Sequence, residues 1–136
     1  MENLIQKHIN FVSRYLQNNQ KDLFIFISKN IDIENDIDYI RKNKDLLDWY
    51  YISMKPLNVD FIREFQDKLD WYYISKDIEL SEDFIRNFQD KVNWRYISEY
   101  QKLSENFIRE FKNKVDWMAI YEHQDLSEEL YKEFYK

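Results

Sequence analysis

Few side chains in this sequence have the types and spacing that catalysis or metal binding requires. His8 and His123 are the only histidines and stand at opposite ends of the chain, and there is no cysteine. A shared histidine site would require the chain to close on itself, and thiol chemistry and cysteine zinc sites are excluded. Glycine is also absent, although phosphate-binding loops depend on it for close backbone approach and positive φ angles. We therefore expect neither enzyme activity nor a cofactor.

Alternating acidic residues give one segment a superficial likeness to a calcium-binding loop: Asp32, Glu34, Asp36 and Asp38. Counted from Asp32, the sixth position is Ile37 and the twelfth is Asn43, where such a loop requires glycine and glutamate. We interpret Asp36 instead as the N-terminal cap of a helix, because its carboxylate can accept from free backbone N–H groups there.

Two further sets of residues recur at a nearly constant spacing. One is a row of tryptophans, Trp49, Trp71, Trp94 and Trp117; the other, the arginine row, is Arg41, Arg63, Arg86 and Arg109, continued by Lys132. Rings and cations in such rows can stack on bases and follow phosphates. An isoleucine follows each tryptophan by three residues, however, which favours a buried structural role. Glutamates four residues before Arg86, Arg109 and Lys132 favour a solvated face that neutralises itself.

Both rows belong to an internal repeat that decides the fold. The stretch WYYISKDIEL at Trp71 returns as WRYISEYQKL at Trp94 and as WMAIYEHQDL at Trp117, each copy 23 residues after the last. An earlier copy at Trp49 precedes Trp71 by 22 residues, so one residue is missing near Pro56. A fixed short period of this kind indicates a stacked repeat array.

Each unit is predicted to contain two short helices, here called A and B. In residues 81–101, helix A places one set of residues on its inner side and helix B another: Phe84, Ile85, Phe88 and Val92, then Trp94, Ile97, Ser98 and Gln101. The expected caps are Asp36, Asn58, Ser81, Ser104 and Ser127 for the A helices, and Asp48, Asp70, Asn93 and Asp116 for the B helices. Because two short helices cannot bury these rings alone, neighbouring units must stack. The expected fold is all-α, an α-solenoid of short two-helix repeats with an N-terminal capping helix.

The whole chain, 1–136, is predicted to be a single domain. It would comprise an N-terminal capping helix (1–21), a degenerate half-repeat (22–35), four two-helix repeats (36–124) and a C-terminal capping half-repeat (125–136). Tyr121 stands at the position of Ser98 and Ala119 at that of Tyr96, which favours an end of the array adapted to close the stack.

Composition limits the location and the partners of the protein. The net charge is −6, from 26 acidic and 20 basic residues, which argues mildly against general nucleic-acid binding. The N-terminus has no continuous apolar run of the signal-peptide kind, and the longest apolar run, residues 23–27, is too short to span a bilayer. We therefore expect a cytoplasmic protein without a membrane partner, located in the host cytoplasm if it is viral.

The pattern L-S-E-x-F-I-R-x-F-x-x-K-V-D-W-x-x-I-S, over about residues 36–136, resembles the short tandem helical repeats found in many proteins of giant viruses, bacteriophages and low-GC bacteria. The resemblance implies an all-helical array and a viral or phage-related setting. It brings no known active site, so no catalytic residue can be transferred. Residues 1–32 depart from the pattern.

Positions that vary between units are not fixed by packing and can be shaped for a ligand. Two such rows lie on the B helices and are called here the B-helix strip: Tyr50, Tyr72, Arg95 and Met118, and four residues later Met54, Lys76, Glu99 and Glu122. On a helical wheel both rows face away from the tryptophan and isoleucine side. Tyrosine, arginine and methionine are typical of protein interfaces, so we predict that this strip binds another protein.

Two functions from different classes follow from these patterns. The first is a non-catalytic protein-binding scaffold, with an inhibitor of a host defence protein, of the anti-CRISPR or another anti-defence type, as one form of it. The alternative is a nucleic-acid-binding repeat array that uses Arg41, Arg63, Arg86 and Arg109 with exposed tyrosines. Net charge and the paired arginines favour the first.

Overall fold

The computed structural model describes residues 3–15 and 19–135 of the chain. Within these residues it contains eleven α-helices and no β-strand, which confirms the predicted all-α class. The contacts between residues divide the chain into two compact units, Met1–Asp70 and Trp71–Lys136. This division falls between a predicted B-helix cap and its helix rather than at a boundary between predicted segments.

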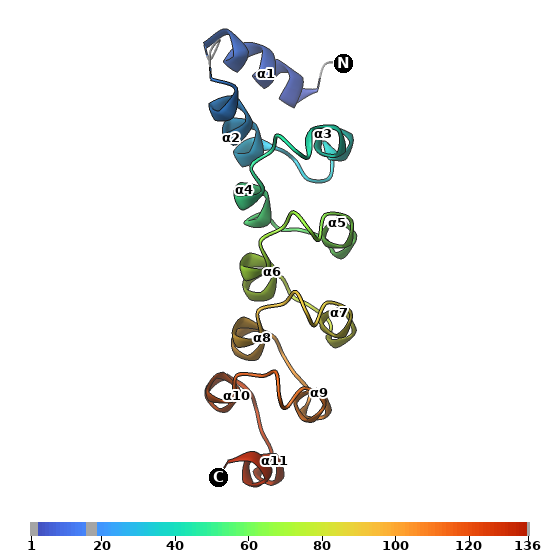
Figure 1. The fold of residues 1–136 in the computed structure, drawn as a ribbon, viewed down its shortest axis with the longest axis vertical. Coiled ribbons are helices and arrows are strands. Elements are labelled where there is room, and N and C mark those ends of the chain that lie inside the picture. Colours follow the sequence, from blue (N-terminus) through green and yellow to red (C-terminus); the bar gives the residue numbers. More distant parts are fainter. Residues whose placement is uncertain (1–2, 16–18, 136) are drawn as a thin grey trace. The chain divides into compact units, whose positions relative to one another are not determined.

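The first unit contains α1 (Leu4–Tyr15), α2 (Gln20–Asn30), α3 (Ile37–Asn43), α4 (Trp49–Ser53) and α5 (Val59–Glu64). Helix α2 packs against α1 on one side and α4 on the other, and α3 and α5 form a second row beside them (Figure 1). Helix α1 is the predicted N-terminal capping helix. Helix α2 is the predicted half-repeat, although it begins at Gln20, ahead of the predicted start of that segment.

The second unit alternates A and B helices throughout. Its B helices are α6 (Trp71–Asp77), α8 (Trp94–Tyr100) and α10 (Trp117–His123), and each packs against the next. Its A helices are α7 (Glu82–Asn87), α9 (Glu105–Glu110) and α11 (Glu128–Phe134), and Figure 1 shows α7 and α9 in a row of their own beside the B helices. Repeated helix pairs with packed neighbours are those of an α-solenoid-like array, as predicted.

Side-chain caps start most of the helices at the predicted residues. Ser81, Ser104 and Ser127 each accept from the backbone N–H group three residues on, at 3.2 Å in every case. Asn58 caps α5 in the same way, and the predicted B-helix caps Asp48, Asn93 and Asp116 also accept from first-turn N–H groups. Each cap satisfies a donor that a helix start leaves free, which explains why the cap positions change so little.

Asp36 does not act as predicted. It stands at the cap position of α3, but its side chain makes no bond to that helix. Instead the buried carboxylate accepts from the backbone N–H of Asp32 at 3.0 Å and from the side-chain amide of Asn3 at 2.9 Å. It therefore closes the turn before α3 and fastens the start of α1 to it. Burial without a bond would be costly for a carboxylate, and these two donors replace the water it loses.

The A helices are shorter than the hydrophobic pattern predicted. Helix α7 ends at Asn87, and Phe88 leaves the helical region with φ −114°. The backbone N–H groups of Lys91 and Val92 then both donate to the carbonyl of Phe88, at 2.9 and 3.1 Å. Val92 is thus buried but lies in the following turn, outside helix A. No described residue has a positive φ angle, so the chain reverses without the backbone conformation that glycine supplies.

An isoleucine column forms the centre of each unit, with aromatic rings around it. Every helix from α3 to α10 contributes one fully buried isoleucine: Ile40, Ile52, Ile62, Ile74, Ile85, Ile97, Ile108 and Ile120. The tryptophans are half-buried and lie against phenylalanines of the following A helix. Trp94 contacts Phe107 and Phe111, with ring centroids 6.2 and 4.9 Å apart, and its indole N–H donates to the carbonyl of Gln89 at 2.9 Å. The structural role predicted for these rings agrees with these contacts, but the rings are not fully enclosed.

Buried serines join successive B helices, which the sequence pattern did not reveal. Ser98 donates to the carbonyl of Trp94 at 2.7 Å and accepts from the backbone N–H of Asp116 at 2.9 Å. The same acceptor bond, from the cap residue of the next B helix, is made by three other serines: Ser28, Ser53 and Ser75. Each serine thereby bonds to two repeats at once, which explains its recurrence after the isoleucine.

Gln101 makes a second buried link in the B layer. Its amide accepts from the N–H of Leu80 at 2.9 Å and donates to the carbonyls of Ser75 and Ile78 at 3.0 and 2.8 Å. Gln124 repeats this arrangement one repeat later. Tyr121, at the position where earlier repeats have serine, lies instead against the rings of Tyr131 and Tyr135.

Candidate protein-binding surface

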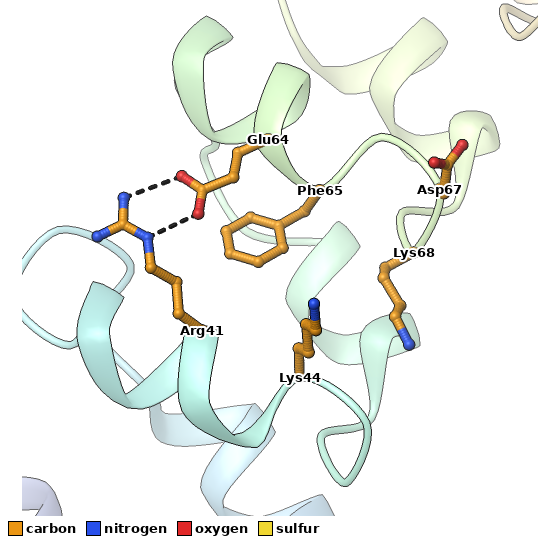
Figure 2. A pocket seen from close by; sticks show the side chains of 6 residues that line it. All are labelled: Arg41, Lys44, Glu64, Phe65, Asp67 and Lys68. Atoms are coloured by element: carbon orange, nitrogen blue, oxygen red, sulfur yellow. Dashed lines mark hydrogen bonds and ion pairs between the residues drawn. The ribbon is translucent and has the colours of Figure 1, made fainter.

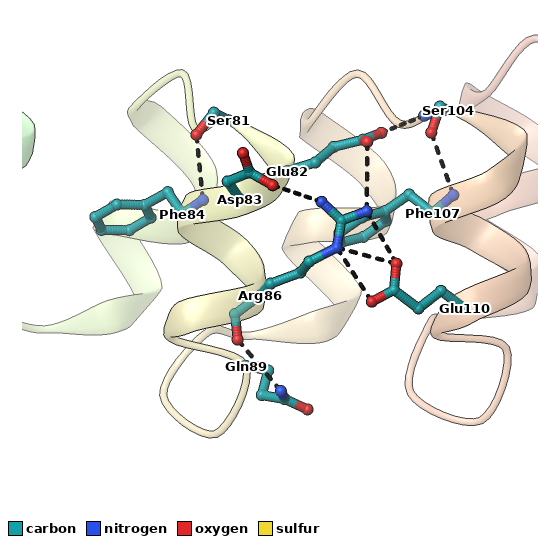
Figure 3. A network of polar contacts seen from close by, with 9 residues as sticks. All are labelled: Ser81, Glu82, Asp83, Phe84, Arg86, Gln89, Ser104, Phe107 and Glu110. Carbon is teal, nitrogen blue, oxygen red and sulfur yellow. Dashed lines mark hydrogen bonds and ion pairs between the residues drawn. The ribbon is translucent and has the colours of Figure 1, made fainter.

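Three members of the arginine row, Arg41, Arg86 and Arg109, form ion pairs with carboxylates. Arg86 of α7 contacts both carboxylate oxygens of Glu110 on α9, at 2.9 to 3.1 Å, and donates to Asp83 at 2.8 Å (Figure 3). Its guanidinium also lies 5.2 Å from the ring centroid of Phe107. The hydrogen bond to Glu110 raises the pKa of Arg86 above its ordinary value. This arginine therefore joins two repeats and has little capacity left for a phosphate.

Arg41 and Arg109 are held in the same way. Arg41 on α3 bonds Glu64 on α5 through two nitrogens, at 2.6 and 2.9 Å, and these bonds lower the pKa of Glu64. Arg109 bonds Glu133 at 3.1 Å, while Arg63 lies exposed on α5. The predicted pairs four residues apart are present at 3.9, 3.5 and 3.2 Å for Arg86, Arg109 and Lys132, and in the first two of these the bond to the next repeat is the shorter one.

Glutamates at the start of the A helices add a backbone link between repeats. Glu82 accepts from the backbone N–H of Ser104, and Glu105 from that of Ser127, both at 2.6 Å (Figure 3 shows the first). The backbone donor lowers the pKa of Glu105, with Arg109 as a further cause. The A-helix face is therefore closed by bonds between its own repeats.

The outer face of the B helices is different, because its first predicted row is exposed. In the second unit Tyr72 is 38 % exposed, Met118 is 72 % exposed, and Arg95 also faces solvent. In the first unit Tyr50 and Met54 are about equally exposed, at 51 % and 50 %. The strip residues carry aromatic, methionine and cationic groups to the surface within each unit, as predicted.

Two residues of the second row are less exposed than predicted. Lys76 is half-buried because its ammonium lies over the rings of Tyr72 and Tyr100, 5.7 and 5.8 Å from their centroids. Glu99 is half-buried and accepts from the hydroxyl of Tyr100, which raises the pKa of that tyrosine. Glu122 is exposed. A helical wheel shows neither contacts with a neighbouring helix, such as that of Lys76 with Tyr100, nor contacts between exposed side chains of one helix, such as that of Glu99 with Tyr100.

A tyrosine cluster on α6 and α8 is the feature that sequence reasoning missed. The ring of Tyr72 meets that of Tyr96 edge to face at 4.8 Å, and Tyr96 lies 6.0 Å from Tyr100. A hydrogen bond with Tyr72 raises the pKa of Tyr96. Tyr100 replaces Asp77 and His123 of the neighbouring repeats, so its variation between units was the available signal. The cluster places the rings of Tyr72 and Tyr100 beside the Lys76 ammonium, and the ring of Tyr96 joins those two rings.

Metal and membrane sites find no support in the part of the chain that the structure describes. The Asp32 carboxylate accepts from the N–H groups of Glu34 and Asn35 and from the Asn35 amide, all at 2.9 Å, and so serves a turn. Across residues 3–15 and 19–135, no three His, Cys, Asp or Glu side chains are grouped to hold a metal ion. No helix within those ranges has the length and apolarity that crossing a bilayer requires.

Comparisons with protein-family models, with curated proteins and with solved structures found no match. The resemblance to viral, phage and low-GC bacterial helical repeats therefore rests on the repeat pattern itself.

Proposed function

We propose that this protein is a non-catalytic helical-repeat scaffold that binds another protein through its B-helix strip. The observation that carries the proposal is the tyrosine cluster on α6 and α8, in which the exposed rings of Tyr72 and Tyr100 flank Lys76 and the half-buried ring of Tyr96 lies between them. Tyrosine supplies a large contact area for few rotatable bonds, and ring-to-ring contacts reduce the entropy that binding would cost. Tyr50 and Met54 extend the same surface type in the first unit.

The contrast with the A-helix face supports this choice of surface. Ion pairs and backbone bonds between repeats occupy the charged groups there, so a ligand would have to displace them. The same pairing weakens the alternative of nucleic-acid binding, because Arg41, Arg86 and Arg109 are each bonded to a glutamate of the next repeat. With a net charge of −6, general attraction to phosphates is also unfavourable.

The class of partner is a further part of the proposal. The resemblance to viral and phage repeat proteins favours a host defence protein, bound by an inhibitor in the host cytoplasm.

A triple variant separates binding from folding. Tyr50→Ala/Tyr72→Ala/Arg95→Ala removes two tyrosines and a cation from the strip and should leave the melting temperature close to that of the parent. The matched control is Tyr131→Ala/Lys132→Ala/Tyr135→Ala, which likewise removes two exposed tyrosines and a cation, here from α11 and the residue after it.

The assay is capture of partners from cell lysate, with and without nuclease, followed by affinity measurement on the purified partner. We expect nuclease-resistant capture of a protein by the parent and the control, and at least tenfold weaker binding by the strip variant. Equal affinity of the folded strip variant would show that the partner binds elsewhere. Capture that nuclease abolishes, together with salt-dependent binding to oligonucleotides, would favour the nucleic-acid alternative.

A further inference from the structure

A hollow of about 230 Å³ opens in the first unit between the C-terminal end of α3 and α5 (Figure 2). Six residues line it: Arg41, Lys44, Glu64, Phe65, Asp67 and Lys68. Phe65 is almost fully buried and presents its ring to the hollow, and Lys44 directs its ammonium group towards that ring (Figure 2).

At the corresponding place in the second unit a glutamine bridges two successive turns. Gln89 of the α7 turn donates to the carbonyl of Arg86 at 3.2 Å and accepts from the ammonium of Lys114 at 2.9 Å. Lys44 stands at the position of Gln89, five residues before the tryptophan, and Lys68 stands at that of Lys114. A lysine cannot accept a bond from Lys68, and the like charges repel. The space that Gln89 bridges in the second unit therefore stays open in the first.

The cations around this hollow are not equally engaged. Arg41 is held by Glu64 and Asp38, and Lys68 donates to Asp45 at 2.6 Å. Lys44 lies near both pairs and contributes to the lowered pKa of Glu64 and of Asp45, yet its ammonium makes no ion pair with any described residue. The acidic groups nearest to it are thus already bonded to other cations.

We propose that this hollow binds a small carboxylate with an apolar body, its carboxylate on the ammonium of Lys44 and its apolar part against Phe65. Lysine provides a compact charge with three donors, and a buried phenylalanine offers no polar group to the rest of the ligand. The carboxylate comes either from a free organic acid or from the terminus of a peptide chain, and the chemistry of the site is the same for both. The site is separate from the B-helix strip and does not depend on the function proposed for that strip.

The test uses amide chemical shifts of the full-length ¹⁵N-labelled protein at constant ionic strength. The probes are sodium benzoate, N-acetyl-phenylalanine, benzyl alcohol as the uncharged counterpart, and inorganic phosphate. We expect saturable shifts from benzoate or N-acetyl-phenylalanine, confined to residues 41–45 and 64–68. Saturation by N-acetyl-phenylalanine alone would identify a chain terminus as the source, and saturation by benzoate a free acid.

Two matched variants locate the effect. Lys44→Gln restores the residue type found at Gln66 and Gln89, so it should fold, close the hollow and weaken carboxylate binding at least tenfold. Lys112→Gln changes the equivalent residue of a later repeat, whose carbonyl likewise accepts from a tryptophan indole, and should leave binding unchanged. Shifts that do not saturate, or that persist in Lys44→Gln, would overturn the proposal. So would equal binding of benzyl alcohol, or tighter binding of phosphate.

Discussion

The A and B helices of the second unit are fastened to their neighbours by different kinds of bond. Between α7 and α9 the links are ion pairs such as Arg86–Glu110, whose side chains are 34 % and 46 % exposed. Between α6, α8 and α10 they are hydrogen bonds of Ser98 and Gln101, both of which are buried. One layer is therefore held by screened charges and the other by neutral bonds shielded from water.

This difference determines which face can bind a partner. Each exposed ion pair contributes little to stability. These pairs lie on the outer side of the A helices, where the paired charges are already bonded to one another. Buried bonds hold the B layer together, so the links between its helices do not depend on charged side chains of the outer side. Exposed side chains such as Arg95 and Met118 can then vary from repeat to repeat without loss of those bonds.

The largest effect should come from the ring where the two layers meet. Phe107 is fully buried and contacts both Trp94 of α8 and Arg86 of α7. Phe107→Ala should lower the free energy of unfolding by about 3–5 kcal/mol, the range for an emptied aromatic site. Trp94→Ala should cost less, since its ring is only half-buried. Urea denaturation followed by fluorescence or circular dichroism compares the two, and a larger loss for Trp94→Ala would mean that the indole is the main packing element.

Removing a buried bond of the B layer should have the next largest effect. Ser98→Ala leaves the N–H of Asp116 without its acceptor, and Gln101→Ala leaves the N–H of Leu80 in the same state. Each should lower the free energy of unfolding by about 1–3 kcal/mol, and added salt should not change the loss. Ser104→Ala is the control, because it removes an exposed cap with an expected cost of about 1 kcal/mol. Equal losses of stability for all three variants would show that the buried bonds contribute no more than the exposed cap.

A smaller effect is expected in the A layer. Arg86→Met keeps the aliphatic contact with Phe107 but removes the bonds to Glu110 and Asp83. The loss of stability should be below that of Ser98→Ala at low salt and should shrink further in 0.5 M NaCl on account of screening at about 4 Å Debye length. Thermal melts at both salt concentrations measure it. A loss that salt does not reduce would indicate that the guanidinium acts through packing.

The smallest expected effect concerns pH and one carboxylate. The folded protein lowers the pKa of Glu105 below its ordinary value of 4.5, because the carboxylate accepts from the N–H of Ser127. Its contribution to stability is therefore complete above pH 4.5 and is lost as the pH falls through the lower folded value. Unfolding by urea at pH 7, 4 and 3 should show a shallower decline for Glu105→Gln than for the parent. An identical decline would show that Glu105 has the same pKa in the folded and unfolded chains.

The fold was predictable because the residues that pack and cap the helices recur in every repeat. The period, the isoleucine at each unit and the caps such as Ser81 and Asn93 are local features that recur at fixed offsets. The exposure of Tyr50, Tyr72 and Met118 followed from the same pattern, since helix geometry places them opposite the buried side. Each of these predictions required only the geometry of a single helix.

What escaped prediction depends on how neighbouring helices meet. Arg86 lies closer to Glu110 of the next A helix than to Glu82, four residues before it in the sequence, which the spacing within one helix does not show. Asp36 serves a turn rather than its own helix because Asn3 and the N–H of Asp32 converge on it. The half-burial of Lys76 likewise depends on Tyr100 of the next helix.

The serine bond between B helices has a consequence for how such a chain tolerates changes of length. The distance along the sequence from the serine to the N–H it accepts is 20, 17, 18 and 18 residues in successive repeats, yet the bond forms each time. By contrast, the tryptophan stands thirteen positions after the A-helix cap residue in every complete repeat, as from Asp36 to Trp49 and from Ser104 to Trp117. Differences in length therefore fall in the loop from helix B to helix A. The serine bond still places the next B helix at the same position relative to the one before it. Repeats of unequal length can thus be exchanged or recombined at this loop without displacing the repeat that follows.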